Sequence, residues 1–377
     1  MVSYSRDNSM RQALPLLLLA PFLAAADPKP FFNGKDLDGW VNLNCGPKTW
    51  SVKDGELVTS GTPYGLLRSD RQYENFEIEF EWMHVNTKDV GNSGFFVWCD
   101  GLPQIGGPYT RGIEVQVLVN YPKNDWATNH GDVFSVSGAT CKPDRPHPTK
   151  KGLERCLPSE DRCKGGGEWN HYKVVANDGS IKLSVNGKEV SGVSDCNPRK
   201  GYLAFESEGA ECHYKNLKFK ELPSTKPKAS EIAAEAAGFQ PIFNHTDLTG
   251  WKTDDGAWKV GGGVLKCSGK ADLKSEASYS DYELVFDWKL PEKSKAEFEL
   301  ELGSQTIYSF KNADSTMHGK WHRLSLKTGR AGVTIAHDGR AGGQASLVLD
   351  KGPIRIKAAE SLELRNMYMR EIQGEKK

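Results

Sequence analysis

Residues 73–82 read YENFEIEFEW, and residues 279–288 read YSDYELVFDW. In the first stretch every second residue from Phe76 to Trp82 is apolar, and the residues between them are glutamates. A period of two is typical of a β-strand that buries one face and leaves the other in water. Because the stretch recurs with a tyrosine at its start and a tryptophan at its end, it predicts the same strand in two places.

Four further landmarks recur in the same order, which indicates two copies of one fold. They are residues 32–40 (FNGKDLDGW) with 243–251 (FNHTDLTGW), 50–57 (WSVKDGEL) with 258–265 (WKVGGGVL), 169–188 with 321–340, and 213–222 (HYKNLKFKEL) with 363–372 (ELRNMYMREI). Between the copies, residues 223–238 (PSTKPKASEIAAEAAG) begin rich in proline and lysine, as linkers often do. We therefore expect a first domain over 27–222 and a second over 239–373.

The connections between the predicted strands are short. Asp-Gly at 178–179, Asn-Gly at 186–187 and Asp-Gly at 338–339 are turn signals that join antiparallel neighbours. Strands of this kind pack as two antiparallel sheets. The sequence therefore predicts an all-β chain with two β-sandwich, or jelly-roll, domains in tandem.

Composition excludes some functions. The chain has 377 residues, enough for two domains, and its 49 lysines and arginines balance its 49 aspartates and glutamates. Binding to nucleic acid or to an anionic membrane surface draws on uncompensated cations. We expect neither as a partner.

The N-terminal segment is typical of a secretory signal. Arg6 and Arg11 precede an apolar stretch over 13–26, and small residues come directly before Asp27. The stretch is shorter than the roughly 20 residues that cross a bilayer, although a retained anchor is the alternative. We expect cleavage after Ala26, no membrane span in the mature chain, and a secreted or periplasmic location.

The cysteines also suit an oxidising compartment. Seven of the eight precede residue 213, and none forms a Cys-x-x-Cys pair of the kind that binds zinc or exchanges thiols. Cys141, Cys156 and Cys163 lie in a segment with few apolar residues, where a crosslink would limit the entropy of the unfolded loop. We expect disulfides there, with the pairing open.

The two copies differ in one segment. Between Trp82 and Trp169 the first copy carries a long stretch that the second copy, between Trp288 and Trp321, largely lacks. A fold that the second copy forms without this stretch does not need it for its core. We therefore expect the chemistry in the additional segment.

Within that segment, residues 112–116 read GIEVQ. If Ile113 and Val115 are buried, Glu114 and Gln116 lie side by side on the open face of the sheet. Glu114 would then serve as a general acid or base, with Gln116 as a hydrogen-bond donor to a sugar hydroxyl or oxyanion. The alternative is that Glu114 only decorates a solvated strand.

These motifs together resemble a known family. FFNGKDLDGW, WSVKDGEL, GNSGFFVW, GIEVQV, GEWNHYKVV and the segment from GYLAFESEG to KNLKFKEL are similar to the 3-keto-disaccharide hydrolase family, which has a laminin-G or concanavalin-like jelly roll. The resemblance covers nearly all of the first domain. The second domain is similar only at its ends, as a degenerate copy.

The resemblance implies an oligosaccharide or glycoside substrate whose C3 hydroxyl has been oxidised to a ketone. The ketone acidifies the hydrogen on C2, its removal allows the group at C1 to leave, and water completes a net hydrolysis. Such a route needs a base, a stabiliser for the enolate oxygen and an acid. A lectin-like protein that binds glycans without catalysis is the alternative, and a conventional glycosidase with paired carboxylates is a third.

Candidate site residues follow from the matching motifs. We expect Asn92, Ser93 and Gln116 to bind substrate, with Glu206 and Glu208 as weaker candidates, and Glu114 to be catalytic.

Two further candidates come from the additional segment. His130 is a possible catalytic base, and Trp98, which has no counterpart in the second copy, is expected nearest the sugar. Tyr64 and Tyr109 are other candidates for an aromatic platform. We expect no cofactor and no metal in the site, although His130 and Asp132 with Glu114, or loop carbonyls and carboxylates, leave a bound Ca²⁺ or other divalent ion open.

Overall fold

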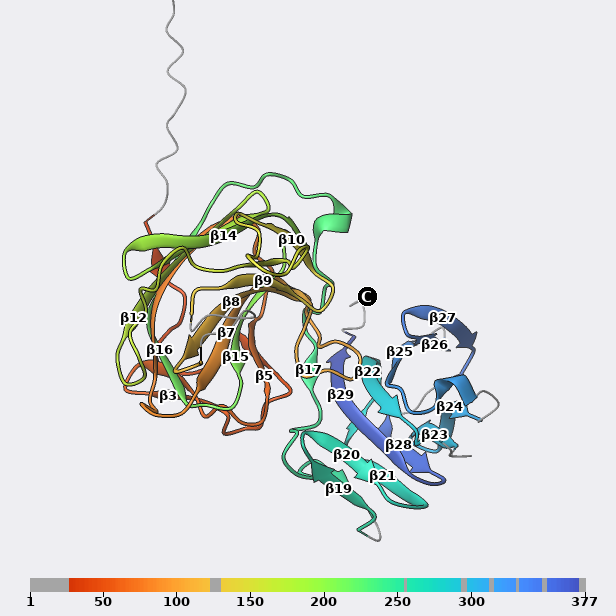
Figure 1. Ribbon diagram of the computed structural model, residues 1–377. Helices are drawn as coiled ribbons and strands as arrows, with labels where there is room; N and C mark the ends of the chain where they lie inside the picture. The colour runs from red at the N-terminus through yellow and green to blue at the C-terminus, as the bar shows by residue number, and fades with distance from the viewer. Residues whose placement is uncertain are drawn as a thin grey trace, which may run out of the picture.

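The computed structural model describes residues 27–122, 130–253, 256–292, 297–311, 315–329, 332–347 and 351–372. The predicted signal segment therefore lies outside the described residues. The described chain is almost entirely β-strand, with two short 3-10 turns at Ala229–Glu231 and Ser315–Met317. The predicted all-β architecture is confirmed. Figure 1 shows the strands gathered into two separate bodies.

The strands of the first body are β1 (Lys29–Pro30), β2 (Trp40–Leu43), β3 (Trp50–Lys53), β4 (Glu56–Thr59), β5 (Gly65–Ser69), β6 (Phe76–His84), β7 (Gly91–Cys99), β8 (Gly112–Val119), β9 (Val133–Val136), β10 (Thr140–Pro143), β11 (Arg155–Cys156), β12 (Asn170–Asn177), β13 (Ser180–Val185), β14 (Lys188–Asn197), β15 (Tyr202–Ser207) and β16 (Cys212–Glu221). The strands of the second body are β17 (Gln240–Pro241), β18 (Trp251–Lys252), β19 (Trp258–Gly261), β20 (Val264–Cys267), β21 (Ala271–Tyr279), β22 (Tyr282–Lys289), β23 (Phe298–Leu302), β24 (Gln305–Phe310), β25 (His322–Gly329), β26 (Gly332–His337), β27 (Arg340–Ala345), β28 (Gly352–Ala358) and β29 (Leu362–Glu371).

Each body is a sandwich of two antiparallel sheets. In the first domain a nine-stranded sheet has the order β10–β14–β13–β12–β6–β16–β4–β3, with β1 beside β16, and it packs on a seven-stranded sheet, β11–β9–β8–β7–β15–β5–β2. In the second domain an eight-stranded sheet, β19–β20–β29–β22–β25–β26–β27 with β17 beside β29, packs on a five-stranded sheet, β18–β21–β28–β23–β24. No sheet of the described chain combines strands from both domains.

The strand β6 shows why alternation leads to this fold. Its apolar residues from Phe76 to Trp82 are completely buried between the sheets, whereas its glutamates are half-exposed on the outer face. There Lys173 on β12 lies 3.2 Å from Glu77 and 3.4 Å from Glu79, so cross-strand charge pairs cover the wet side. The core of the domain therefore follows directly from the period of two.

The predicted disulfides are not present. The seven cysteines of the first domain are free thiols, and all except Cys163 are buried. The segment around Cys141 and Cys156 is held instead by strand pairing, β10 with β14 and β11 with β9. Backbone hydrogen bonds and burial thus take the place of the expected crosslinks.

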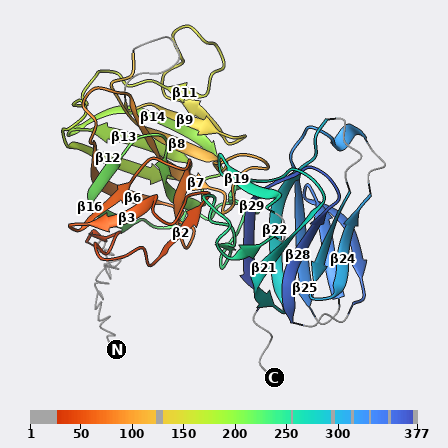
Figure 2. The same ribbon diagram turned by 90° about the horizontal axis from the view of Figure 1, so that it is seen from below.

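The two domains share an apolar interface. Leu66 and Phe96, on the outer face of the seven-stranded sheet, belong to one buried cluster with Phe239, Val285 and Tyr368 of the second domain. Figures 1 and 2 show β29 and β22 on the side of the second domain that faces the first. One part of this outer face is therefore covered by the second domain.

A buried ion pair lies beside the apolar interface. Asp287 on β22 has no exposed side-chain surface, and both its oxygens accept bonds from Arg323 on β25, at 2.7 and 3.0 Å. Asn366 and the backbone N–H of Gly106 also donate to Asp287, at 2.6 and 2.8 Å. Because Gly106 belongs to the first domain, the pair contributes to the domain interface.

We predict that Arg323→Ala lowers the free energy of unfolding by about 3 kcal/mol, because it leaves the Asp287 carboxylate buried without its cation. The matched control is Lys327→Ala on the same strand, whose exposed pair with Glu283 should contribute less than about 1 kcal/mol. Urea denaturation of the whole chain measures both values. Equal effects of the two variants would contradict the assigned importance of the buried pair.

Candidate functional site

A cavity of about 310 Å³ opens on the outer face of the seven-stranded sheet, next to the part that the second domain covers. Its floor is built by β7, β8 and β15, which lie side by side. The lining residues are Val90, Asn92, Tyr109, Glu114, Gln116, Leu118, Tyr121, Phe134, Arg155, Glu206 and Glu208. Three of these are carboxylic acids, which is the feature that sets the cavity apart.

Alternation along β8 brings Glu114 and Gln116 to this face, as the sequence predicts. Ile113 and Val115 are completely buried between the sheets, and Glu114 and Gln116 point to the outer side. The outer side is not open to water, however, since Glu114 and Gln116 are each only 6% exposed. Glu114 therefore does not lie on a solvated face, which was the alternative to a functional role.

Gly94 in the GNSG motif makes room for the acids. A Cβ at this position would lie 2.7 Å from Glu114 Oε1 and 2.9 Å from Glu206 Oε2, so any other residue here would push these two carboxyl groups out of their present positions. Glycine therefore allows carboxyl groups from β8 and β15 to approach each other over the backbone of β7.

A chain of hydrogen bonds holds the neighbouring polar groups. Asn92 Nδ2 donates to Glu208 Oε2, and Gln116 Nε2 donates to Asn92 Oδ1 over 2.9 Å. Arg155 Nη2 donates to Gln116 Oε1 over 3.1 Å, and Arg155 Nε donates to the buried Asp132 over 2.6 Å. Both amides and one carboxylate are therefore fixed in orientation.

Burial and mutual repulsion disfavour ionisation of the acids. Burial raises the pKa of Glu114 to about 8, with a further contribution from the charge of Glu208, while Arg155 opposes the rise. Burial and then the charge of Glu114 raise the pKa of Glu206 well above its ordinary value. Burial also raises the pKa of Glu208, although hydrogen bonds to its carboxylate oppose the rise. At neutral pH at least one carboxyl group of the cavity therefore keeps its proton, as a general acid requires.

Tyr109 lines the cavity beside this group of acids. Burial and the charges of Glu206, Glu208 and Glu114 raise its pKa, so the phenol keeps its proton. The phenol lies beside the carboxyl group of Glu208, and this contact opposes the rise in the pKa of Glu208. Tyr109 is therefore a proton-bearing donor that a ligand can engage.

The structure brings Asn92, Glu114 and Gln116 together in this cavity, with the weaker candidates Glu206 and Glu208. It places Ser93 elsewhere. Ser93 follows Asn92 on β7, so its side chain points inward, where it is completely buried and bonds to Tyr214 and to the carbonyl of Glu206. Ser93 therefore links β7 to β15 and β16 and does not face the substrate.

Trp98 and His130 also lie away from the cavity. Trp98 is completely buried in the sandwich core, and its Nε1 donates to the carbonyl of Glu74, so it offers no platform to a sugar. His130 is 6% exposed, bonds to Asp161 and accepts the amide of Cys163. Burial lowers the pKa of His130. The predictions for these two residues are wrong, since a motif position alone does not tell which way a side chain points.

Sequence reasoning missed Arg155 and Phe134. Arg155 lies on the two-residue strand β11 and contacts the ring of Phe134 at 3.8 Å, and both line the cavity. No local signal marks Arg155, because β11 joins the sheet only through its pairing with β9.

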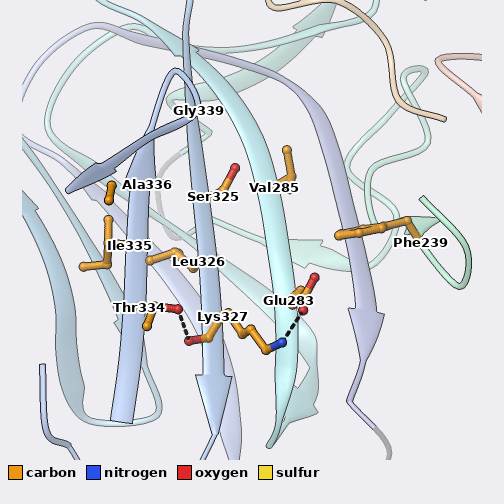
Figure 3. Close-up of a pocket in the computed structure, with 11 residues that line it drawn as sticks. Phe239, Glu283, Val285, Ser325, Leu326, Lys327, Thr334, Ile335, Ala336 and Gly339 are labelled. Carbon is orange, nitrogen blue, oxygen red and sulfur yellow. Dashed lines mark hydrogen bonds and ion pairs between the residues drawn. The ribbon is translucent and has the colours of Figure 1, made fainter. Parts of the chain in front are cut away.

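On the equivalent face of the second domain, the buried carboxylate is paired with basic side chains. β23 and β28 occupy the places of β7 and β15 in the sheet order, and there Glu301 lies 2.5 Å from Lys357 and 3.6 Å from Arg355. A second cavity, of about 380 Å³, lies on the other sheet of this domain (Figure 3). Its charged residues Glu283 and Lys327 bond to each other over 3.0 Å. Neither face offers a comparable group of acids.

Within the described ranges, no group of three or more His, Cys, Asp or Glu side chains is arranged to hold a metal ion. In the same part of the chain, no helix is long and apolar enough to cross a membrane.

The two antiparallel sandwiches and the carboxyl-lined cavity define a protein of two β-sandwich domains with an acidic cavity on the first. The chain belongs to the family of 3-keto-alpha-glucoside-1,2-lyase-like domains, whose sequence profile matches residues 27–220 and 238–318. The resemblance drawn from the motifs is thereby confirmed. Among curated proteins, none matches the chain significantly.

Solved structures with a similar fold each cover about half of the chain. A candidate glycosyl hydrolase from Parabacteroides distasonis is 25% identical, with a TM-score of 0.39, over 52% of this chain and 94% of that one. The carbohydrate-binding module CBM66 from Bacillus subtilis is 14% identical, with a TM-score of 0.35, over 48% and 96%. A β-glucanase from Bacillus licheniformis is also 14% identical, with a TM-score of 0.35, over 53% and 100%.

We predict that Glu114→Gln stabilises the protein at pH 8 but not at pH 5. A carboxyl whose pKa is higher in the folded than in the unfolded state binds its proton more tightly when folded. Stability is therefore lost as pH rises from the ordinary value of 4.5 toward about 8. Glutamine avoids this loss, so the gain at pH 8 should be at least about 1 kcal/mol.

Thermal or urea unfolding at the two pH values measures the effect. Glu79→Gln, on the half-exposed outer face of β6, is the control and should show no such dependence. A difference between wild type and Glu114→Gln that stays constant with pH would contradict the raised pKa.

Proposed function

We propose that the first domain cleaves glycosides that carry a ketone at C3, by removing the C2 proton, eliminating the group at C1 and adding water. The observation that supports this most is the group of three buried acids, Glu114, Glu206 and Glu208, around Gly94. Family membership supports the same chemistry. A binding site alone would not need to keep carboxyl groups of like charge in a desolvated cavity, which is costly.

The first step is proton removal. Glu208 is the acid best suited to act as base, because it is the least buried and the N–H of Asn92 stabilises its anion. It takes the C2 proton, and the C–H electron pair forms the C2–C3 double bond while the C3 oxygen becomes an enolate. The phenol of Tyr109, which keeps its proton, is placed to donate to that oxygen.

The second step is departure of the leaving group. The enolate re-forms the C3 ketone, a double bond forms between C1 and C2, and the C1–O bond breaks. Glu206 remains protonated beside Glu114 and gives its proton to the departing oxygen. Water then adds to C1 and a proton returns to C2, so the net change is hydrolysis. Glu114 belongs to the same group of interacting acids as Glu206 and Glu208. It acts as an acid or a base in the removal of the C2 proton or in the departure of the leaving group.

We predict that the mature chain releases the aglycone from a 3-keto-glucoside and not from the corresponding plain glucoside. Glu114→Gln should lower kcat/KM by about 100-fold, since an amide neither gives nor takes the proton. Glu79→Gln is the control and should stay within twofold of wild type. A chromogenic aglycone allows both rates to be followed by absorbance.

Two outcomes would count against this function. Turnover of Glu114→Gln at the wild-type rate would remove Glu114 from the chemistry. Binding of the keto-glucoside without any turnover by wild type would favour a lectin-like protein instead.

We further propose that residues 1–26 direct the chain out of the cytoplasm, because the small residues Ala24, Ala25 and Ala26 precede Asp27 as a cleavage site requires. Expression of the full chain in a bacterium with a secretion pathway should yield a mature protein that begins at Asp27. Intact-mass spectrometry of the exported protein checks this. A product that retains the first 26 residues would contradict it.

A further inference from the structure

The loop between β7 and β8 carries Tyr109 and rests on the second domain. Its base is closed within the first domain, where Asp100 pairs with Arg111 over 3.0 and 3.1 Å. Near the end of the loop, the carbonyl of Tyr109 accepts the N–H of Gln104 over 2.8 Å. The ring of Tyr109 lies 6.4 Å from that of Phe96 on β7. The loop therefore passes from the domain interface to the carboxyl cavity.

The second domain binds the backbone of this loop at several points. Arg323 donates to the carbonyl of Pro103 over 2.7 Å, and Arg365 donates to the carbonyl of Gly106 over 2.7 Å. Asn366 donates to the carbonyls of Gln104 and Gly107 over 2.8 and 3.2 Å. The N–H of Gly106 in turn donates to the buried Asp287. These bonds leave the loop little freedom to shift.

Close packing adds to these bonds. Gly106 has a φ of +70°, and a Cβ there would lie 2.3 Å from the ring of Trp321. At the next turn of the loop, Asn44 donates to the carbonyl of Pro108 over 2.9 Å and accepts the hydroxyl of Tyr368 over 2.9 Å. Pro108 directly precedes Tyr109, so the second domain holds this residue indirectly, through Asn44, while its direct bonds to the loop end at Gly107.

The asparagine, the tryptophan and the carboxylate that hold the loop have counterparts in the first copy, but those counterparts do not bind a loop. Asn216 and Trp169 correspond to Asn366 and Trp321 in the repeat. Asn216 Nδ2 donates to Glu81 over 2.7 Å, as Asn366 donates to Asp287 over 2.6 Å, and both asparagines have a left-handed φ. Asn216 is exposed, whereas Asn366 is completely buried under the loop. The repeated motif has thus become a docking surface in the second copy.

We propose that the second domain is a positioning platform for the reaction of the first, and that Asp287, Trp321 and Asn366 hold Gly106 so that Tyr109 stays against Glu208. This inference rests on the proposed function, and it assigns a role to a copy that has lost its own group of acids. Tyr109 is the residue that contacts substrate, and the platform residues act through it.

The test is Gly106→Ala in the full mature chain. The added methyl group cannot fit against Trp321, so the loop must lift and Tyr109 must move. We expect kcat/KM for the 3-keto-glucoside to fall by at least about 10-fold, since a displacement of about 1 Å can cost up to 100-fold. Gly55→Ala is the matched control, because Gly55 also has a left-handed φ, of +80°, but a Cβ there meets nothing within 4 Å.

A second pair of variants guards against a folding defect. Asn366→Ala removes donors to the loop, and Asn216→Ala removes the equivalent donor in the first copy, on an exposed face. Only Asn366→Ala should lower kcat/KM, with circular dichroism showing that both variants are folded.

A double-mutant cycle asks whether the effect acts through Tyr109. In a protein that already carries Tyr109→Phe, Gly106→Ala should lower kcat/KM by less than twofold, because the hydroxyl group that Gly106→Ala would displace is absent. An undiminished effect of Gly106→Ala in the Tyr109→Phe background would overturn the proposal. Activity of Gly106→Ala equal to that of Gly55→Ala would do the same.

A readout that needs no turnover separates this inference from the proposed function. With ¹³Cζ-labelled tyrosine, the resonance of Tyr109, assigned with Tyr109→Phe, should follow the titration of the neighbouring acids, and Gly106→Ala should remove at least half of that response. If wild type is inactive on the keto-glucoside but this response is lost in the variant, the platform stands and the proposed function fails. A response unchanged by Gly106→Ala would overturn the platform itself.

Discussion

Glu114, Glu206 and Glu208 lie close together in a desolvated cavity, and the repulsion between their negative charges is the constraint on which the site depends. Carboxyl groups that share a desolvated space cannot all be ionised, so at least one keeps its proton at neutral pH. Gly94 allows the close approach, and Asn92 and Arg155 stabilise negative charge at different edges of the cavity. The arrangement costs stability and provides an acid and a base in one place, which is a common compromise at active sites.

The outer face of the seven-stranded sheet serves two purposes. One part, with Leu66 and Phe96, is sealed by the second domain, and the adjoining part carries the acids. Leu66 is the direct cross-strand partner of Glu206, and Phe96 is the partner of Glu114. The apolar interface therefore borders the acids on two strands, and burial of one part contributes to the low polarity of the other. The first copy carries the group of three acids, whereas on the corresponding face of the second copy Glu301 is neutralised by Lys357 and Arg355.

Much of the fold could be predicted because it rests on periodicity. The alternation in β6 and β8 determines which residues enter the core, and the repeated landmarks reveal the two copies. Alternation predicted the place of Glu114 and Gln116, whereas Asn92 and Glu206 were expected only from the family resemblance. Trp98 was misplaced because the backbone at this residue has a left-handed φ of +53° where β7 and β15 change register, and its side chain turns into the core. Arg155 and the docked loop depend on contacts between segments far apart in sequence, and no local pattern records these.

The protonation of the acids is the most direct test of the account. ¹³C NMR of the mature protein, labelled at the glutamate side-chain carboxyl carbon, gives the titration of each acid, with Glu114→Gln, Glu206→Gln and Glu208→Gln providing the assignments. The account predicts that at least one of the three carboxyl groups remains protonated at pH 7 and that removing one acid lowers the pKa of the others. Three independent titrations near the ordinary value of glutamate would contradict it.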